Sequence, residues 1–426
     1  MRIFQNAATA IAWCEARAAF EQGDEATRES VREIIRDVRE RGDAALVDLT
    51  ARFDGAVLEG VVVPNDQLAA AEGELPPDLA SAIRLAAARV EAYYRGQAEG
   101  GFMHAADGGI LGQLIVPLES VGCYVPGGTA PLFSTVLMTA VPGRVAGVER
   151  VVVATPPRAD GSVPPEVRFA ALVAGVDQVL RVGGAHGVAA LAYGTASVRR
   201  VDKIVGPGNR YVVEAKRQLF GAVGIESLPG PTETLVVADE AAAPTHVVAD
   251  LLAQAEHAQA QPVLVTTSLA LLEHVVTALP AAAAALPAPR AAVGSVEERG
   301  VAVLVADLDE AMDVANAFAP EHLCLLVTDP WRLAARARNA GGLFLGAHSL
   351  EALGDYLVGP SHVMPTGATA RFSSFVNLRD FQKVVPVTYL TPAQVRRLGP
   401  AAALMARAEG LEAHARAIEA RLGPEA

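Results

Sequence analysis

Glutamate and histidine stand side by side in the segment Ala319-Pro-Glu-His322, where a helical pattern gives way to an apolar strand. Histidine titrates near neutrality, so its imidazole can accept or donate a proton during catalysis. A neighbouring carboxylate can activate a water molecule. The segment therefore predicts acid–base chemistry by His322, assisted by Glu321. The alternative is a helix-to-strand turn in which these polar residues are incidental.

A second set of residues has the side chains of a metal site. Gln254 and His257 are three residues apart in a helical pattern, so we expect them on one face of a helix. Asp355 lies in the glycine-flanked segment GDYLVGP, where a carboxylate oxygen suits zinc together with imidazoles. Taken alone, the Gln254 and His257 pair is better explained by a surface or hydrogen-bonded histidine than by a metal ligand, whereas an acid at Asp355 has little reason to be buried unless it binds something. Glu409 and His414, near the C-terminus, resemble a solvated helix face when considered alone.

Glycine-rich turns follow three predicted strands, at Gly127-Gly128, Gly183-Gly184 and Gly206-Pro207-Gly208. In open α/β sheets, ligands bind beside the carboxyl ends of the strands. None of the turns matches GxGxxG with a following acidic residue, so the strict dinucleotide-binding fingerprint is absent. A single glycine pair indicates only a tight turn, but three turns at one sheet edge favour a ligand cleft.

Composition limits the class of protein. A chain of 426 residues is too long for one compact core, and a hydrophobic fraction of 51% indicates a globular protein. The net charge of −13 disfavours binding to nucleic acid, which needs a basic face. Only three cysteines occur, without CxxC spacing, so a thiolate metal site or a disulfide framework is not expected. Without a signal-peptide pattern or an apolar run long enough to cross a bilayer, we expect a soluble cytoplasmic protein with no membrane contact.

Apolar strands alternate with helices from residue 122 to residue 346. This pattern predicts right-handed βαβ crossovers and parallel sheets. The expected fold is α/β, with two Rossmann-like parallel-sheet domains and small, mainly helical N- and C-terminal extensions. Residues 1 to about 60 have helical patterns, residues 100–109 resemble a loop, and the chain from residue 372 onward resembles a helical tail.

Six segments together resemble the histidinol dehydrogenase family, in order and across nearly the whole chain. They read YVPGGTAPLFSTVLM, VDKIVGPGN, DLLAQAEH, APEH, GDYLVGPSHVMPT and EGLEAH. Members of this family oxidise L-histidinol through L-histidinal to L-histidine in two NAD-dependent steps, the last of histidine biosynthesis. They are homodimers that contain zinc, which implies one Zn²⁺ per subunit here.

The resemblance implies a role for each candidate residue. His322 is the expected general base of both steps, and Glu321 is expected to activate the water that attacks the aldehyde. Zinc is expected to hold the substrate's amine and imidazole. The implied zinc ligands are Gln254, His257, Asp355 and His414. The implied substrate contacts are Thr232, Gln254, His257, His322, Asp355, Glu409 and His414, with Glu409 and His414 contributed across the subunits of the homodimer.

The NAD contacts implied by the resemblance are Tyr124, Asn209 and His186. His186 stands in GGAH, where the family usually has glutamine in GGAQ, so this contact departs from the family pattern. Thr232 stands in GPTE instead of the commoner GPSE and keeps the hydroxyl group. GPSH replaces the commoner GPNH, and His362 in that segment is left without a role.

The resemblance also implies which domain carries each function. An N-terminal helical extension covers residues 1–24. The first Rossmann-like domain, 25–121 plus 232–371, carries the zinc and catalytic motifs. The second, 122–231, forms the NAD side, and the C-terminal helical extension 372–426 reaches the partner subunit.

Two other functions compete with histidinol oxidation. A relative with the same zinc site could act on another alcohol, such as sulfopropanediol, although a carboxylate at Glu409 suits a cationic amine better than a sulfonate. A non-catalytic nucleotide- or metal-binding protein is the second alternative. The adjacent acid and base at Glu321 and His322 disfavour it, because binding alone requires no such pair.

Overall fold

The computed structural model describes residues 1–17, 25–106, 109–127 and 131–423. The end of the expected N-terminal extension and Gly128 of the first glycine turn lie outside these ranges. The chain divides into two compact units, one formed by Met1–Gln97 and Leu118–Phe381, the other by Ala98–Pro117 and Gln382–Ala426. We describe each unit separately.

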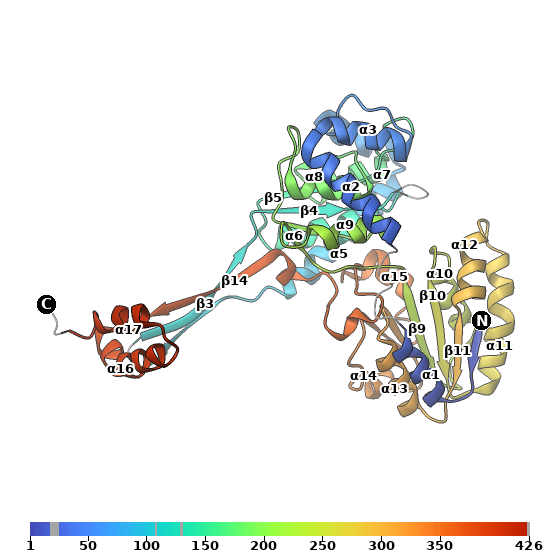
Figure 1. The fold of residues 1–426 in the computed structure, drawn as a ribbon. Helices are drawn as coiled ribbons and strands as arrows, with labels where there is room; N and C mark the ends of the chain where they lie inside the picture. Colours follow the sequence, from blue (N-terminus) through green and yellow to red (C-terminus); the bar gives the residue numbers. More distant parts are fainter. Residues whose placement is uncertain (18–24, 107–108, 128–130, 424–426) are drawn as a thin grey trace. The chain divides into compact units, whose positions relative to one another are not determined.

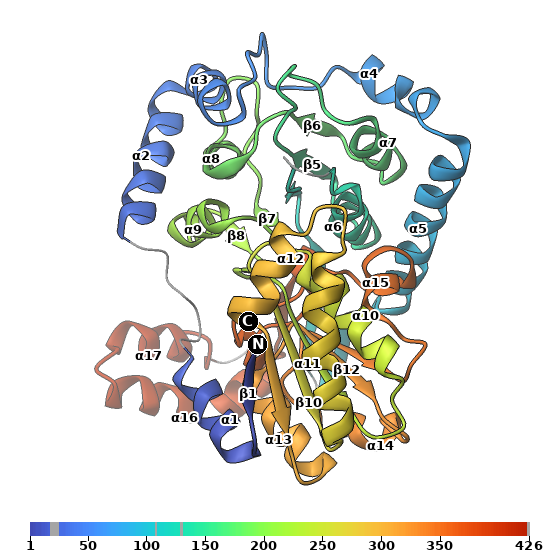
Figure 2. The same cartoon turned by 90° about the vertical axis from the view of Figure 1, so that its right-hand side faces the viewer.

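The first unit contains a six-stranded parallel sheet, the large sheet, in the order β1-β11-β10-β9-β12-β13 (Figure 1). Its central strands are runs of valine and leucine that are buried on both faces, as expected for a parallel sheet. Helices α1 and α13 cover one face, and α10, α11 and α12 cover the other (Figure 2). The bounds are β1 Arg2–Phe4, β9 Glu233–Ala238, β10 Gln261–Thr266, β11 Val301–Leu304, β12 His322–Leu326, β13 Gly342–Leu345, α1 Ala7–Ala16, α10 Pro244–Ala255, α11 Leu269–Ala284, α12 Arg290–Gly294, α13 Leu308–Phe318 and α14 Pro330–Ala334.

The same unit contains a five-stranded parallel sheet, the small sheet, in the order β6-β5-β4-β7-β8. Counted along the chain, β4–β8 and β9–β13 each follow the order 3-2-1-4-5. The expected pair of Rossmann-like parallel sheets is confirmed. The bounds are β4 Ser120–Tyr124, β5 Arg150–Ala154, β6 Gln178–Leu180, β7 Lys203–Val205, β8 Gly224–Ile225, α6 Phe133–Val145, α7 Pro165–Val173, α8 Gly184–Tyr193 and α9 Arg210–Leu219.

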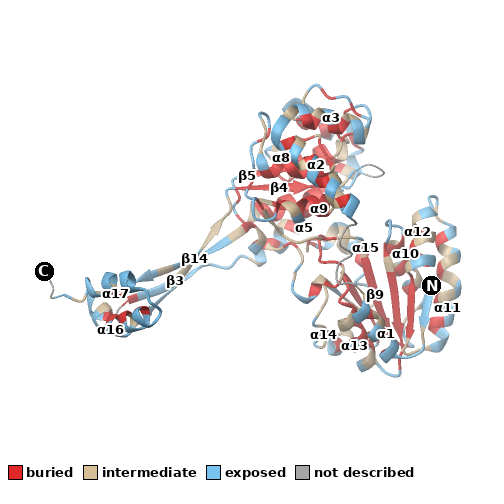
Figure 3. Cartoon of the chain, viewed as in Figure 1, coloured by how far each residue is buried: buried red, intermediate tan, exposed pale blue. Residues whose placement is uncertain are grey.

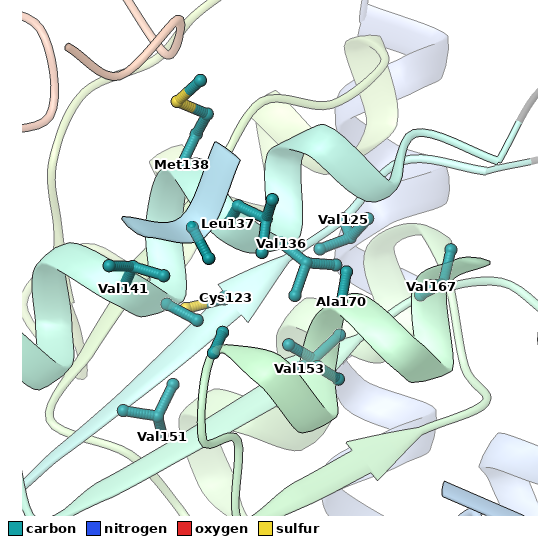
Figure 4. Packing of buried hydrophobic residues seen from close by; sticks show 14 of the residues in the cluster. Cys123, Val125, Val136, Leu137, Met138, Val141, Val151, Val153, Val167 and Ala170 are labelled. Atoms are coloured by element: carbon teal, nitrogen blue, oxygen red, sulfur yellow. The ribbon is translucent and has the colours of Figure 1, made fainter. Parts of the chain in front are cut away.

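The interior of the small sheet is packed with valine and alanine. In Figure 4, Val153 of β5 lies close to Ala170 of α7, and both belong to one buried cluster with Val151 of β5 and Val136 of α6. Figure 3 shows that the central strands of both sheets are buried, whereas the helices present an exposed face. Small and β-branched side chains therefore form the rigid cores that carry the loops at the strand ends.

The packing of the N-terminal helices differs from the domain grouping expected from the sequence. Helices α2 (Glu25–Arg41) and α3 (Asp43–Asp54) pack on the small sheet beside α8 and α9, and α5 (Pro77–Gly96) packs there beside α6 and α7. The grouping of residues 25–121 with the large sheet, expected from the sequence, is therefore wrong for these helices. The apolar stripe of an amphipathic helix specifies which face is buried, but not which sheet it covers.

The N-terminal segment also differs from a purely helical extension. Residues Arg2–Phe4 form β1, which pairs with β11 at the edge of the large sheet, and α1 packs against α13. Three residues are too few to show a strand period in the sequence, so the pattern of the following helix dominates the prediction.

The second unit is an antiparallel sheet in the order β14-β3-β2, with two helices that pack on each other. Its elements are β2 Phe102–Ala106, β3 Gly109–Pro117, β14 Gln382–Tyr389, α16 Pro392–Ala408 and α17 Glu412–Glu419. The expected loop at 100–109 contains β2, and the expected helical tail contains β14. Both strands are largely exposed, and β14 includes Pro386, so neither carries a strand signal in the sequence. None of the described helices has the length and apolar character needed to cross a membrane.

Candidate active site

The candidate catalytic residues meet at the amino-terminal edge of the large sheet. Thr232 directly precedes β9 and His322 begins β12, and the parallel register pairs His322 with Thr234. The Thr232 hydroxyl donates to Glu321 Oε2 at 2.6 Å, and the Glu233 backbone N–H donates to the same oxygen at 3.1 Å. Two strands separated by almost ninety positions in the chain thereby hold Glu321 in one orientation.

The turn before β12 directs Glu321 and His322 toward this edge. Helix α13 ends at Phe318, and Ala319 adopts φ 55°, a left-handed conformation that is unusual for alanine. The Ala319 backbone N–H still bonds to the Ala315 carbonyl at 2.8 Å. Pro320 then prevents any continuation of the helix. The segment APEH therefore forms a fixed change of direction that puts both side chains at the start of a buried strand.

His322 is placed as a neutral proton acceptor. Its side chain is 2% exposed, and Nδ1 lies 3.2 Å from the Glu233 carbonyl oxygen. Because a carbonyl oxygen only accepts, Nδ1 carries the proton and Nε2 carries the lone pair. Nε2 is buried and has no hydrogen-bond partner among the described residues. Burial lowers the pKa of His322, which keeps the imidazole neutral and able to accept a proton.

Glu321 is a buried acid with increased proton affinity. Burial raises its pKa well above the usual value, while the bonds from Thr232 and Glu233 act in the opposite direction. A carboxylate with a raised pKa is a stronger base toward water than an exposed one. The arrangement therefore suits Glu321 to water activation. Because Glu321 and His322 are adjacent, both side chains lie at the amino-terminal edge of the large sheet.

The candidate metal donors come from two segments of the first unit. Gln254 is 2% exposed at the end of α10, and its Nε2 lies 3.4 Å from Asp355 Oδ2. Asp355 lies in a single π-helical turn, Gly354–Val358. Gln254 Oε1 accepts a hydrogen bond from Thr232 at 3.2 Å, so these donors adjoin the catalytic edge.

The expectation that Gln254 and His257 share a helix is wrong. Helix α10 ends at Ala255, so the exposed His257 lies in the turn that follows, with its backbone N–H bonded to the Gln254 carbonyl at 3.1 Å. Within the described ranges, no three histidine, cysteine or acidic side chains converge as a metal site. The expected set supplies only one imidazole and one carboxylate from this unit, with an amide as third donor. These donor atoms suit zinc if another residue completes the shell.

Glu409 and His414 belong to the second unit. Glu409 ends α16 as its cap, His414 lies on α17, and both side chains are exposed. Because both side chains are exposed, Glu409 and His414 are accessible to a ligand or to another protein chain.

The candidate NAD residues lie at the carboxyl-terminal edge of the small sheet. Tyr124 ends β4, and its hydroxyl accepts a hydrogen bond from the Gly184 N–H at 2.9 Å. Asn209 caps α9, accepting bonds from the Tyr211 and Val212 backbone N–H groups at 3.0 and 3.2 Å. Gly206 has φ 122°, and a Cβ there would lie 2.1 Å from the Tyr124 carbonyl oxygen. Strands β4 and β7 flank the point where the strand order reverses, where open α/β sheets bind ligands.

His186 is enclosed by the protein. It is 1% exposed, with Nε2 3.2 Å from the Thr50 hydroxyl and 4.0 Å from Asp54 Oδ2. Burial lowers the pKa of His186 to about 4, and burial raises that of Asp54 to about 6. The ring faces α3, so a contact with NAD would require it to leave this position.

Sequence reasoning missed two buried acids. Glu351 is 1% exposed beside His322, and Glu226 forms an ion pair with Lys216 of α9 at 2.8 Å. Both partners of that pair are buried, and each bonds to the backbone of Gly206. One feature of the sequence could have indicated Glu351: it stands four residues before Asp355, so the two acids lie close to the same turn.

The two edges of the large sheet are built differently. At the carboxyl-terminal edge, Asp239 follows β9 and accepts hydrogen bonds from the Thr328 N–H at 2.8 Å and hydroxyl at 2.9 Å. Asp239 is 5% exposed. The Asp239 carboxylate thus links the carboxyl ends of β9 and β12. At the corresponding end of the small sheet stands Gly206, which has no side chain.

Comparisons with known proteins agree along the whole chain. The family model described as histidinol dehydrogenase matches residues 17–422. A histidinol dehydrogenase of Deinococcus radiodurans is 57% identical over 94% of this chain and 92% of its own. One of Thermus thermophilus is 51% identical over 93% and 95%. The crystal structure of histidinol dehydrogenase from Elizabethkingia anophelis matches with a TM-score of 0.93 at 32% identity, covering 99% of this chain and 98% of that one.

Proposed function

The chain belongs to the histidinol dehydrogenase family, and we propose that it oxidises L-histidinol through L-histidinal to L-histidine, the last steps of histidine biosynthesis, with two molecules of NAD⁺. The observation that carries this proposal is the buried, neutral His322, with Nε2 unpartnered among the described residues, next to Glu321. An alcohol oxidation by hydride transfer requires a base of this kind for the hydroxyl proton.

In the first step, His322 Nε2 takes the proton of the histidinol hydroxyl while the carbinol carbon gives a hydride to NAD⁺. The products are L-histidinal, NADH and protonated His322, which returns its proton to solvent. In the second step, Glu321 accepts a proton from water as the water oxygen attacks the aldehyde. His322 then takes a hydroxyl proton from the hydrate as a second NAD⁺ receives hydride, and the product is L-histidine.

Gln254, His257 and Asp355 would hold Zn²⁺, together with His414 of a second subunit. Amide oxygen, carboxylate and imidazole are suitable zinc donors, and the 3.4 Å approach of Gln254 to Asp355 supports this grouping. Bound zinc would fix the substrate's amine and imidazole as a Lewis acid. Thr232 and His322 border the same edge, and Glu409 of the second subunit would accept a hydrogen bond from the substrate's amine.

The small sheet would bind NAD. Tyr124 and Asn209 flank the reversal of strand order, and Gly206 leaves the backbone uncovered by a side chain. His186 is proposed to contribute at the same edge in place of the family's glutamine, after movement of its ring away from Thr50.

A homodimer is proposed because the second unit exposes several large apolar side chains. They include Phe102, Met103, Leu111, Leu404 and Met405, each at least 48% exposed in the single chain. Burying such side chains against another subunit is favourable. The three cysteines are free and buried, in agreement with the reducing cytoplasm proposed for the enzyme.

The decisive assay uses zinc-loaded protein with L-histidinol and NAD⁺, and follows NADH absorbance and histidine together. Two NADH per histidine are expected. If histidinol gives no NADH but sulfopropanediol is turned over, the proposed site would stand and its substrate would be sulfopropanediol. Absence of turnover with both alcohols would refute the proposed activity.

The shared site has its own test. His414→Ala and His322→Ala proteins should each be inactive, whereas mixed dimers should regain activity because one of their two sites contains both intact residues. Subunit exchange is verified by mass spectrometry of differently labelled subunits. No recovery in proven mixed dimers would refute a site completed by the second subunit.

A further inference from the structure

Glu351 is a buried carboxylate to which the proposed mechanism assigns no role. It begins α15 (Glu351–Leu353) and is 1% exposed. Its Oε1 accepts hydrogen bonds from the Thr234 hydroxyl and, at 2.8 Å, from Cys324 Sγ. Thr234 belongs to β9 and Cys324 to β12, so the two central strands fix one oxygen of the carboxylate.

The second oxygen of Glu351 faces His322. Oε2 is buried, has no hydrogen-bond partner among the described residues, and lies 3.6 Å from His322 Nδ1. Nδ1 is the nitrogen that donates to the Glu233 carbonyl, so the carboxylate lies beside the N–H side of the ring. The opposite nitrogen, Nε2, is the proton acceptor of the proposed mechanism.

Other charged groups near His322 have different attachments. Glu321 Oε2 is 3.8 Å from Nδ1 but is engaged by Thr232 and the Glu233 N–H. The Glu233 side chain is paired with Arg17 at 2.8 Å. Three further groups, Asp355, His257 and His362, act on the imidazole through longer-range electrostatics. Glu351 is therefore the acid whose open oxygen adjoins the ring and whose other oxygen is anchored to the sheet.

We infer that Glu351 is a positioning residue for His322, holding the imidazole with Nε2 toward the substrate and stabilising the imidazolium formed during each oxidation. This inference rests on the proposed function. The substrate hydroxyl proton moves to Nε2, the Nδ1 proton stays in place, and the ionised Glu351 balances the new positive charge. No further reactant is required, because NAD⁺ takes the hydride.

The charge state of Glu351 gives this role a pH dependence. Burial raises the pKa of Glu351 to about 8; the hydrogen bonds from Cys324 and Thr234 act against this rise, and the charges of Asp355 and Asp250 add to it. The ionised fraction therefore grows as the pH rises from 7 to 9, and the rate of oxidation grows with it. An opposite charge this close raises the pKa of a base by roughly one unit or more, which is about tenfold in proton affinity.

The test compares Glu351→Gln with Glu351→Asp in the zinc-loaded dimer. Glu351→Gln keeps the shape of the side chain but removes its charge, so kcat should fall about tenfold or more while KM for histidinol changes less than twofold. The rise in kcat between pH 7 and 9 should flatten. Glu351→Asp keeps the charge and should retain more activity than the glutamine variant.

Asp239→Asn is the matched control for the loss of a buried charge. Asp239 follows the same strand β9 but lies at the opposite edge of the sheet, bonded to Thr328. Its substitution should lower stability without changing the pH profile of kcat. Cys324→Ala removes one anchor of Glu351 but no charge, so its kcat should lie between those of wild type and Glu351→Gln. An unchanged kcat and pH profile in Glu351→Gln would overturn the inference.

A measurement without turnover separates this inference from the proposed function. In ¹⁵N-histidine-labelled, zinc-loaded protein, the His322 signals are assigned by comparison with His322→Gln and titrated in wild type and Glu351→Gln. The imidazolium pKa of His322 should fall in Glu351→Gln. If wild type does not oxidise histidinol, the proposed function fails while this titration still decides the pairing, and an unchanged His322 titration overturns it.

Discussion

Replacing Lys216 should locally unfold the carboxyl-terminal end of the small sheet, where NAD is proposed to bind. Lys216 is 0% exposed, and its ammonium group lies 2.8 Å from both carboxylate oxygens of Glu226. It also donates to the Gly206 carbonyl at 3.1 Å, while Glu226 accepts from the Gly206 N–H at 2.8 Å. The pair thus holds both polar backbone groups of Gly206, the glycine that permits the close approach to Tyr124.

The magnitude follows from the burial of both charges. In Lys216→Met, Glu226 keeps a buried charge without its partner, which typically costs about 3–5 kcal/mol of unfolding free energy. The Gly206 carbonyl loses a donor as well, for about 1 kcal/mol more. The double variant Lys216→Met/Glu226→Gln has no buried charge, so it should recover about half of the loss or more.

Urea unfolding followed by far-UV circular dichroism measures the global effect, and amide hydrogen exchange locates it. Peptides from β7 and α9 should exchange roughly three to four orders of magnitude faster in Lys216→Met, since about 1.4 kcal/mol corresponds to tenfold. NAD binding, measured by calorimetry, should weaken in parallel. Arg84→Met is the control, because the Arg84–Glu72 pair is exposed and should contribute at most about 1 kcal/mol. A loss below 1 kcal/mol in Lys216→Met, or no recovery in the double variant, would refute this reasoning.

Three further predictions concern single side chains. The folded-state pKa of His186, about 4, lies below its unfolded value of about 6.5, so its contribution to stability is complete above pH 6.5 and is lost as the pH falls toward 4. Urea titrations at pH 7 and 5 should show about 2 kcal/mol more loss in wild type than in His186→Gln, and equal losses would contradict the buried neutral ring. Tyr94→Phe should lower the unfolding free energy by about 1–3 kcal/mol, seen as a lower urea midpoint, because the buried Tyr94 hydroxyl donates to the Val376 carbonyl and accepts from the Ser361 N–H. Glu321→Gln should slow histidinal oxidation more than histidinol oxidation, so the aldehyde should accumulate in a trapping assay; equal slowing of both steps would argue against water activation by Glu321.

The sequence predicted the two parallel sheets because their strands are short apolar runs between helices, a strong local signal. It could not assign α2, whose buried Val31, Ile34 and Val38 identify a face but not the sheet that receives it. Strand β14 escaped prediction for a related reason. Its valines at 384 and 385 are exposed, so burial imposes no alternation on the sequence.

The same distinction applies to the candidate site. Glu321 and His322 are neighbours in the chain, so the acid–base chemistry proposed for them could be predicted from four residues. Glu351 receives its hydrogen bonds from residues 117 and 27 positions away, and no local pattern encodes such a meeting. The Lys216–Glu226 pair is closer, ten residues apart, but only the intervening turn after α9 brings it together. Adjacent chemistry can be predicted from a sequence, whereas chemistry assembled by a sheet requires the fold.

The closure of one sheet end by Asp239 affects how this protein can evolve. The two parallel sheets have the same strand order, but their carboxyl ends differ: Gly206 leaves that of the small sheet open, whereas Asp239 and Thr328 close that of the large sheet. If the small sheet binds NAD as proposed, a substitution that tunes nucleotide affinity would act on loops that do not carry Glu321 or His322. Selection could then adjust affinity for the coenzyme and proton transfer independently, and an engineer could change coenzyme preference while leaving the proposed proton-transfer residues untouched.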